Sequence, residues 1–84
     1  MSATRTKAVR GPLVELLAEA NRQLTGFRSQ VTEQAAWVRL LDRVGEDTDD
    51  ARATLAIFQE TLRFAEKHRE ILVAELADET LKPR

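Results

Sequence analysis

Residues 44–50 read Val-Gly-Glu-Asp-Thr-Asp-Asp, and this short stretch decides the fold because it separates two long amphipathic segments. Gly45 can take the left-handed backbone conformation that ends a helix without steric cost. Asp47 or Thr48 can cap a second helix, and the two aspartates that follow suit the positive end of its dipole. Two long helices joined by so short a connection are antiparallel neighbours.

The segment before this stretch has the pattern of a helix over residues 12–44. Gly11 and Pro12 favour a helix start, since proline at the first helical position gives up an amide that would be unpaired anyway. Apolar residues then recur at alternating spacings of three and four, which is the heptad pattern of lengthwise helix packing. The series is Leu13, Leu17, Ala20, Leu24, Phe27, Val31, Val38 and Leu41, with Gln34 filling its one gap.

The segment after the stretch repeats the pattern over residues 48–80. Its series is Ala51, Leu55, Phe58, Leu62, Ala65, Arg69, Leu72 and Leu76. We call the two series together the seam. In a hairpin that folds at residues 45–47, facing residues have numbers that add to roughly 92, so Phe27 meets Ala65 and Ala20 meets Leu72. Large residues then lie opposite small ones, while Arg69 lies near Gln23 and within reach of Glu19.

The predicted fold class is therefore all-α, an antiparallel two-helix hairpin over residues 12–81. Residues 1–11 are polar and basic without an apolar period, which predicts a flexible tail, and residues 82–84 form a second short tail. Gly26 inside the first helix costs roughly 1 kcal/mol against alanine, which points to close helix approach or a slight bend. Three glutamines on its buried side, at positions 23, 30 and 34, either pair across the seam or stay half exposed.

Both helices carry more apolar surface than one partner helix covers. In the second helix Ile57, Phe64 and Ile71 form a stripe offset from the seam, with His68 at its edge, and Trp37 extends the seam of the first. Exposing these side chains would create the kind of patch that marks an association surface. We therefore expect a homodimer, closed as a four-helix bundle, with Trp37, Ile57, Phe64, His68 and Ile71 at the interface. A groove for a helix of another protein is the alternative.

Length and composition support a partner chain. Eighty-four residues allow one modest core, and chains of this size usually need disulfides, a metal or an oligomeric partner. With no cysteine, disulfides and thiolate-ligated zinc are excluded. The first forty residues contain no uninterrupted apolar run, so we expect a cytoplasmic protein without a membrane partner. Arginine outnumbers lysine ten to three, as is typical of GC-rich bacterial genomes.

Charge is divided unevenly between the two halves. Residues 1–45 carry seven basic and four acidic side chains, for +3, whereas residues 46–84 carry six basic and ten acidic ones, for −4. Opposite charges favour packing of one half against the other. The overall charge of −1 disfavours a dedicated nucleic-acid binder. Weak nucleic-acid binding through Arg5, Lys7 and Arg10 of the tail stays an alternative.

Candidate chemistry is sparse. His68 is the only histidine, and the residue three before it is Ala65, so the Glu-x-x-His motif of carboxylate metal sites in bundles is absent. A helical bundle that binds a metal or small ligand near His68 is an alternative reading. No activated nucleophile or acid and base set is apparent, so we expect no catalytic residues and no cofactor. The sequence thus favours a small non-enzymatic interaction module, such as an adaptor, assembly factor or regulator, that self-associates through helix faces.

Overall fold

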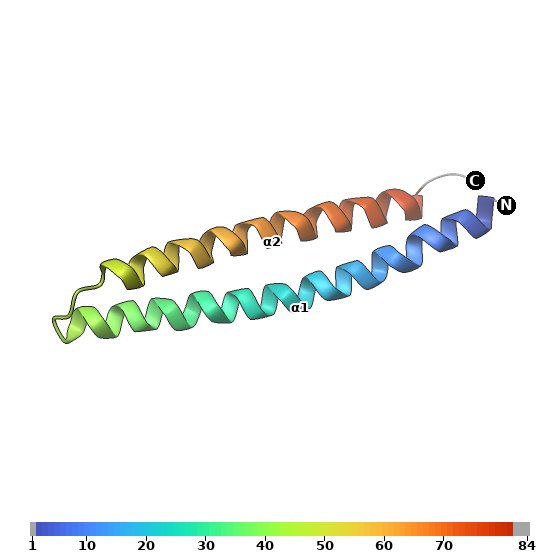
Figure 1. The fold of residues 1–84 in the computed structure, drawn as a ribbon. Helices are drawn as coiled ribbons and strands as arrows, with labels where there is room; N and C mark the ends of the chain where they lie inside the picture. The colour runs from blue at the N-terminus through green and yellow to red at the C-terminus, as the bar shows by residue number, and fades with distance from the viewer. Residues whose placement is uncertain (1, 82–84) are drawn as a thin grey trace.

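The chain forms two long helices in a computed structural model, which describes residues 2–81 and gives side-chain positions for residues 10–81. Helix α1 spans Ser2–Arg43 and helix α2 spans Asp49–Leu81. They lie side by side and run in opposite directions, so the start of α1 and the end of α2 lie at the same end of the rod, remote from the turn (Figure 1). The predicted all-α hairpin is confirmed. It is a rod of 66 × 14 × 14 Å.

The turn that joins the helices is built as its sequence predicts. Gly45 has a φ of +79°, the left-handed conformation that L side chains rarely adopt. The amide of Glu46 donates to the carbonyl of Leu41 at 2.9 Å, and the amide of Gly45 donates to the carbonyl of Asp42 at 3.2 Å. These two bonds are the pair that closes a helix in the Schellman arrangement. They satisfy carbonyls that the end of α1 would otherwise leave open.

Both residues proposed as caps take part in starting α2. The amide of Arg52 donates to the carbonyl of Thr48 at 2.8 Å, which makes Thr48 the N-cap of the backbone. The carboxylate of Asp47 accepts a hydrogen bond from the amide of Asp49 at 3.0 Å. One orphan amide of the first turn is thereby satisfied, and Asp49 and Asp50 place negative charge at the positive end of the dipole.

The start of α1 differs from the prediction. The helix begins at Ser2, so Pro12 lies inside it and the expected helix start at Pro12 was wrong. The predicted flexibility of residues 1–11 stays a prediction. Proline at that position removes a single backbone hydrogen bond, while the alanine, lysine and arginine residues before it are good helix formers. The first turns of α1 extend beyond the end of α2 (Figure 1). Residues 82–84 lie outside the described residues.

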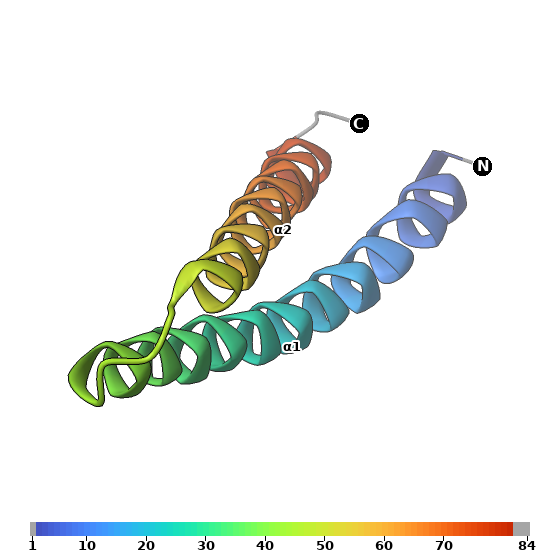
Figure 2. The same cartoon turned by 60° about the vertical axis from the view of Figure 1, so that its left-hand side comes forward.

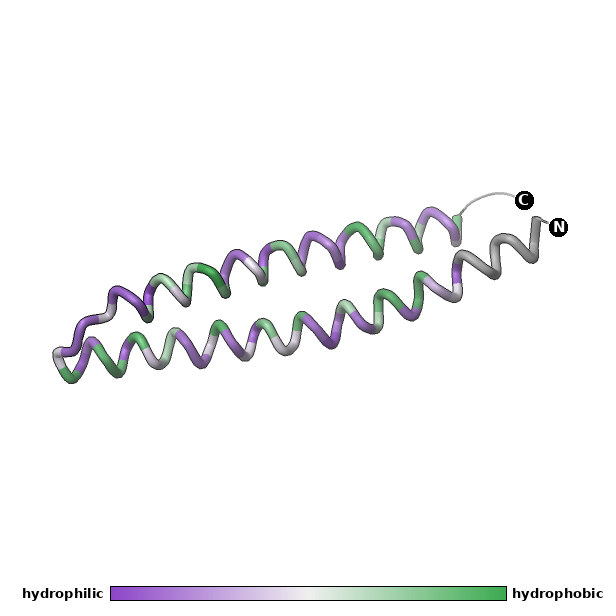
Figure 3. The backbone as a smooth tube through the Cα atoms, in the orientation of Figure 1, coloured by the Kyte–Doolittle hydropathy of each residue, from purple (hydrophilic) through white to green (hydrophobic). Residues whose placement is uncertain are grey.

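The seam packs as predicted. Every residue of both series is buried or partly buried. The most buried side chains all belong to it, namely Ala20, Leu24, Val38, Ala51 and Leu72. Hydropathy along the backbone alternates with the turns of both helices, as an apolar line on each helix requires (Figure 3). Helix α1 curves gently along its length (Figure 2), a common response of long helices to a packed side and a solvated side.

The core is thin. Among the described side chains none is less than 2% exposed, and the most buried, Leu24, is at that 2% limit. Two helices alone bury one line of side chains against one other line, so each seam residue still has solvent on at least one flank. The hairpin therefore packs its side chains along a single line between the two helices. Any further burial of apolar side chains has to come from contact with another surface.

Candidate protein-interaction surface

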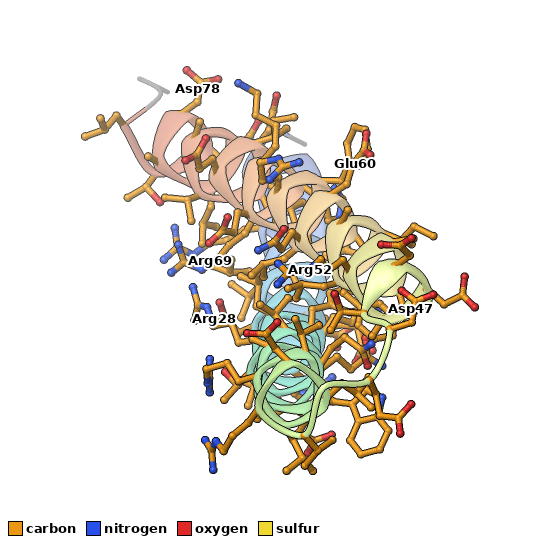
Figure 4. All side chains as sticks on the ribbon, turned by 90° about the vertical axis from the view of Figure 1, so that its left-hand side faces the viewer. Arg28, Asp47, Arg52, Glu60, Arg69 and Asp78 are labelled. Atoms are coloured by element: carbon orange, nitrogen blue, oxygen red, sulfur yellow. The ribbon has the colours of Figure 1, made fainter. Side chains whose placement is uncertain are left out.

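One flank of the hairpin is held by polar contacts between the helices. The guanidinium of Arg69 in α2 donates from Nε to Oδ1 of Asn21 in α1 at 2.6 Å. Arg28 Nη2 in α1 lies 3.9 Å from Glu66 Oε2 in α2. Figure 4, which looks along the hairpin from the turn, shows Arg28 and Arg69 on the same side of it. We call this side the polar flank.

The partner of Arg69 is a correction to the prediction. Its guanidinium bonds to Asn21 rather than to Gln23 or Glu19. Asn21 lies on the polar flank, seven residues before Arg28, whereas Gln23 and Glu19 are each two residues from it and so turned about 200° to the other side of the seam. The carboxylate of Glu19 bonds within α1 instead, to Arg22 Nε at 3.0 Å and to Gln23 Nε2 at 3.5 Å.

These contacts also fix the register of the hairpin. Residue numbers at the four cross-helix contacts add to between 85 and 94, and two of them, Asn21 with Arg69 and Arg10 with Thr80, add to 90. The expected sum of roughly 92 is thus close to the observed register. A sum of 90 defines which residues of α1 and α2 lie at the same level along the rod.

Gln34, the polar residue of the seam, bonds across it. Its side-chain nitrogen donates to the backbone carbonyl of Ala51 at 3.0 Å, and the bond is partly buried. Only one axial position of α2 presents that carbonyl, so the bond specifies register where an apolar residue would not. Gln23 instead bonds within α1, and Gln30 is exposed. The cross-seam reading therefore holds for Gln34 alone among the three.

The opposite flank is apolar and uncovered. Phe64 is 69% exposed and Trp37 is 49% exposed, although both are among the largest apolar side chains in the protein. Five others on this side are also exposed. We call the whole set the apolar face: Leu16, Trp37, Leu40, Val44, Ile57, Phe64 and Ile71.

Helix geometry places both halves of the apolar face on one side. In α1, Asn21 and Arg28 are two turns apart on the polar flank, and Trp37 lies nine residues after Arg28, which at 100° per residue turns it to the other side of the seam. In α2, Phe64 lies two residues before Glu66 and is likewise turned away from the polar flank. Because the polar contacts define one common flank, the two exposed stripes share the other.

The expected interface residues thus lie together on one surface. Trp37, Ile57, Phe64 and Ile71 are all exposed, and so is His68, which lies four residues after Phe64 and one turn from it. Leu16, Leu40 and Val44 join them. The signal for Leu16 and Val44 is in the sequence, because each is separated from Trp37 by a multiple of seven residues.

Within one chain, the described residues around His68 do not form a metal site. Among the residues whose side chains the structure describes, no group of three or more histidine, cysteine, aspartate or glutamate side chains is arranged to hold a metal ion. Across residues 2–81, neither helix has a stretch long and apolar enough to cross a membrane.

Comparison of the sequence with protein-family models and curated proteins, and of the fold with solved structures, finds no match. The function therefore has to be inferred from the residues and their arrangement.

Proposed function

We propose that this chain is a small non-enzymatic protein-interaction module that self-associates through its apolar face into a four-helix bundle. Roles such as adaptor, assembly factor or regulator fit a rod of this kind, whose chemistry lies in its surfaces. The observation that carries the proposal is the apolar face itself, seven exposed large side chains on one flank of a hairpin with a thin core.

The absence of a deep core supports an additional partner. Described residues of the hairpin include no side chain buried below 2% exposure, whereas stable small domains commonly gain deep burial, disulfides or a partner chain. A second hairpin packed onto the apolar face would give a four-helix bundle, in which the side chains between the two hairpins form a core surrounded by four helices. The seam residues would gain cover on one flank at the same time.

The size of the apolar face is adequate for weak to moderate self-association. Its side chains are already about half covered, so drying each one is worth roughly 1 kcal/mol, half the usual value for a large apolar side chain. Two copies contribute fourteen, or about 14 kcal/mol, against an association cost of roughly 4–15 kcal/mol. Dimerisation therefore requires that nearly all of the apolar face becomes dry together.

A charge on the apolar face tests the proposal. Phe64→Glu should convert a dimer into a monomer in light scattering, because each copy loses the burial of a large aromatic side chain and places a charge on the apolar face. Phe64 makes little contact within its own hairpin, so the helical content of the variant should persist.

Val14→Glu is the matched control. Val14 is 48% exposed and lies seven residues before Asn21, on the polar flank. Its variant should keep the dimer. An unchanged mass for Phe64→Glu, or an equal loss for both variants, would contradict the proposed surface.

Other occupants of the apolar face are separated by the same measurements. If the wild-type chain is a monomer that associates only with a helix of another protein, the self-association proposed here is wrong. A stoichiometric metal in native mass spectrometry of the untreated chain would favour the ligand reading at His68. A salt-sensitive gel shift lost on deleting residues 1–10 would favour nucleic-acid binding. The cytoplasmic location and bacterial origin that the sequence favours stay predictions.

A further inference from the structure

Resting on the proposed self-association, we propose how the second copy is oriented. The two hairpins pack with their apolar faces together about a two-fold axis parallel to the rod. Helix α1 of each copy then lies over α2 of the other, and both turns lie at the same end of the bundle. Phe64 of each copy lies over Gly26 of the partner subunit.

Symmetry fixes the register of this arrangement. A two-fold axis along the rod permits no sliding of one copy past the other, so residues meet only those at their own level. The contacts of Asn21 with Arg69 and of Arg10 with Thr80 set those levels, because both pairs have numbers that add to 90. Any pair with this sum, one residue from each copy, therefore faces across the interface.

Two rows of residues, one in each helix, contain the outer residues of the apolar face and complement each other at these levels. The row in α1 is Pro12, Glu19, Gly26, Glu33 and Leu40, each seven residues from the next. The row in α2, taken in the opposite direction, is Asp78, Ile71, Phe64, Ile57 and Asp50. Each level thus combines at most one acidic residue with one apolar or small residue, and the glutamate stems can cover apolar side chains while their carboxylates reach water.

Gly26 lies at the level of Phe64, the largest side chain in these two rows. A Cβ built on Gly26 would meet nothing within 4 Å, so the glycine is not required by packing inside its own hairpin. Glycine in the middle of a helix costs roughly as much as a hydrogen bond contributes. Phe64 itself is 69% exposed. A glycine at this level explains the loss of helix stability, since a backbone without a side chain leaves room for the ring of Phe64 from the second copy.

The other two-fold arrangement, with turns at opposite ends, is less favourable. It also aligns apolar residues, placing Phe64 on its own copy and Ile57 on Ile71. However, it places each row of one copy on the same row of the other copy, running in the opposite direction. Glu19 then faces Glu33 and Asp50 faces Asp78, and each of these contacts occurs twice. Like charges held this close are destabilising.

Net charge points the same way. Helix α1 carries seven basic and four acidic residues, for +3, and α2 carries four basic and eight acidic ones, for −4. The proposed arrangement surrounds each helix with helices of opposite net charge, whereas the rival one sets like beside like. The two acidic turns do meet at one end, but they are exposed and salt screens them.

A distance between the two turns decides the orientation. The chain has no cysteine, so Glu46→Cys in the exposed turn gives one spin label per copy. Pulsed electron resonance should show a label separation within about 25 Å, since helices in a bundle lie about 8–10 Å apart. The rival arrangement, centred on Gly26, puts the turns about 55 Å apart at 1.5 Å per residue. The longer distance in a sample of dimeric mass would overturn the orientation alone, and a monomeric mass would overturn both the orientation and the self-association.

Cross-linking tests the contact between Phe64 and Gly26 directly. Mixing the Gly26→Cys and Phe64→Cys chains under mild oxidation should give a disulfide-linked dimer, and Gly26→Cys alone should give at least tenfold less. Disulfides form only between Cα atoms about 4.4–6.8 Å apart, so the pattern reports which helices are neighbours. Ser29→Cys, on the exposed outer side of α1, is the control and should cross-link with neither chain. Efficient self-cross-linking of Gly26→Cys would contradict the orientation.

Discussion

Gly45 carries the connection between the helices because its backbone has a positive φ that other residues reach only with strain. The two hydrogen bonds that close α1 depend on that conformation. The conformation of the turn therefore depends on one residue, Gly45, and the carboxylate of Asp47 after it caps the start of α2.

Substituting this glycine should destabilise the hairpin. Gly45→Ala is expected to lower the free energy of unfolding by about 1–2 kcal/mol, the cost of the left-handed conformation for a residue with a Cβ. Gly11→Ala is the matched control, since Gly11 lies within α1, has no positive φ and has open space around a Cβ. Its helix propensity should rise, adding up to about 1 kcal/mol. Urea titration followed by circular dichroism measures both, and equal effects would contradict the role of Gly45.

The contrast between seam and apolar face can be tested with two truncations. Leu24 is 2% exposed and Ile57 is 62% exposed. Leu24→Ala should cost about 2–5 kcal/mol, which is enough to unfold a chain with so thin a core. Ile57→Ala should leave the helical content unchanged at high protein concentration but raise the dimer dissociation constant by about 30-fold, since each dimer loses two such side chains, about 2 kcal/mol in all. Sedimentation at several concentrations distinguishes the two outcomes.

At the scale of elements, the seam could be predicted from the sequence because heptad periodicity belongs to the chain itself. Spacings of three and four identify all five of the most buried side chains, and they also place the partly buried Gln34 and Arg69 in the seam. The turn could also be predicted, since Gly45 and the capping residues after it are local sequence signals. The exact partner of Arg69 could not be predicted in this way, because heptad spacing gives the residues of the seam but not the flank of α1 that the Arg69 guanidinium meets.

The start of α1 shows the limit of local signals. Pro12 favours a first helical position, yet the same residue is tolerated inside a helix when propensity on both sides outweighs one lost hydrogen bond. Where the helix begins depends on differences in helix propensity of about 1 kcal/mol per residue. A single proline does not decide between free energies that differ by so little. The candidate surface had a different limit, because sequence shows surplus apolar residues but not that both stripes share one flank.

Removing the first turns of α1 should have little effect on the stability of the hairpin or on its proposed self-association. Deletion of residues 2–8 takes away helix that extends past α2, so the mean helical signal should fall while the melting temperature and the dimeric mass stay the same. Among the amide hydrogens of α1 that have an acceptor within the helix, those of residues 6–9 should exchange fastest, because unsupported helix ends open most readily. A large drop in melting temperature on deletion would show that these turns pack against another surface.

On the scale of the whole molecule, the protein is a rod with two unlike flanks. One flank is closed by Arg28 with Glu66 and Arg69 with Asn21, and the other presents the apolar face. A hairpin that buries only one line of side chains has little stability of its own, so folding and association should be linked. The melting temperature should accordingly rise with protein concentration, by several degrees per tenfold increase for a domain of this size. A melting temperature independent of concentration would indicate a self-sufficient monomer.

Sedimentation equilibrium of the unmodified chain at micromolar concentration, read together with the fluorescence of Trp37, tests the central claim most directly. A single hairpin leaves Trp37 49% exposed, whereas a bundle closed over the apolar face dries its indole. We predict a mass of twice the 9.5 kDa chain, blue-shifted emission and protection from soluble quenchers. A cooperatively folded species of 9.5 kDa whose indole is freely quenched would contradict the account.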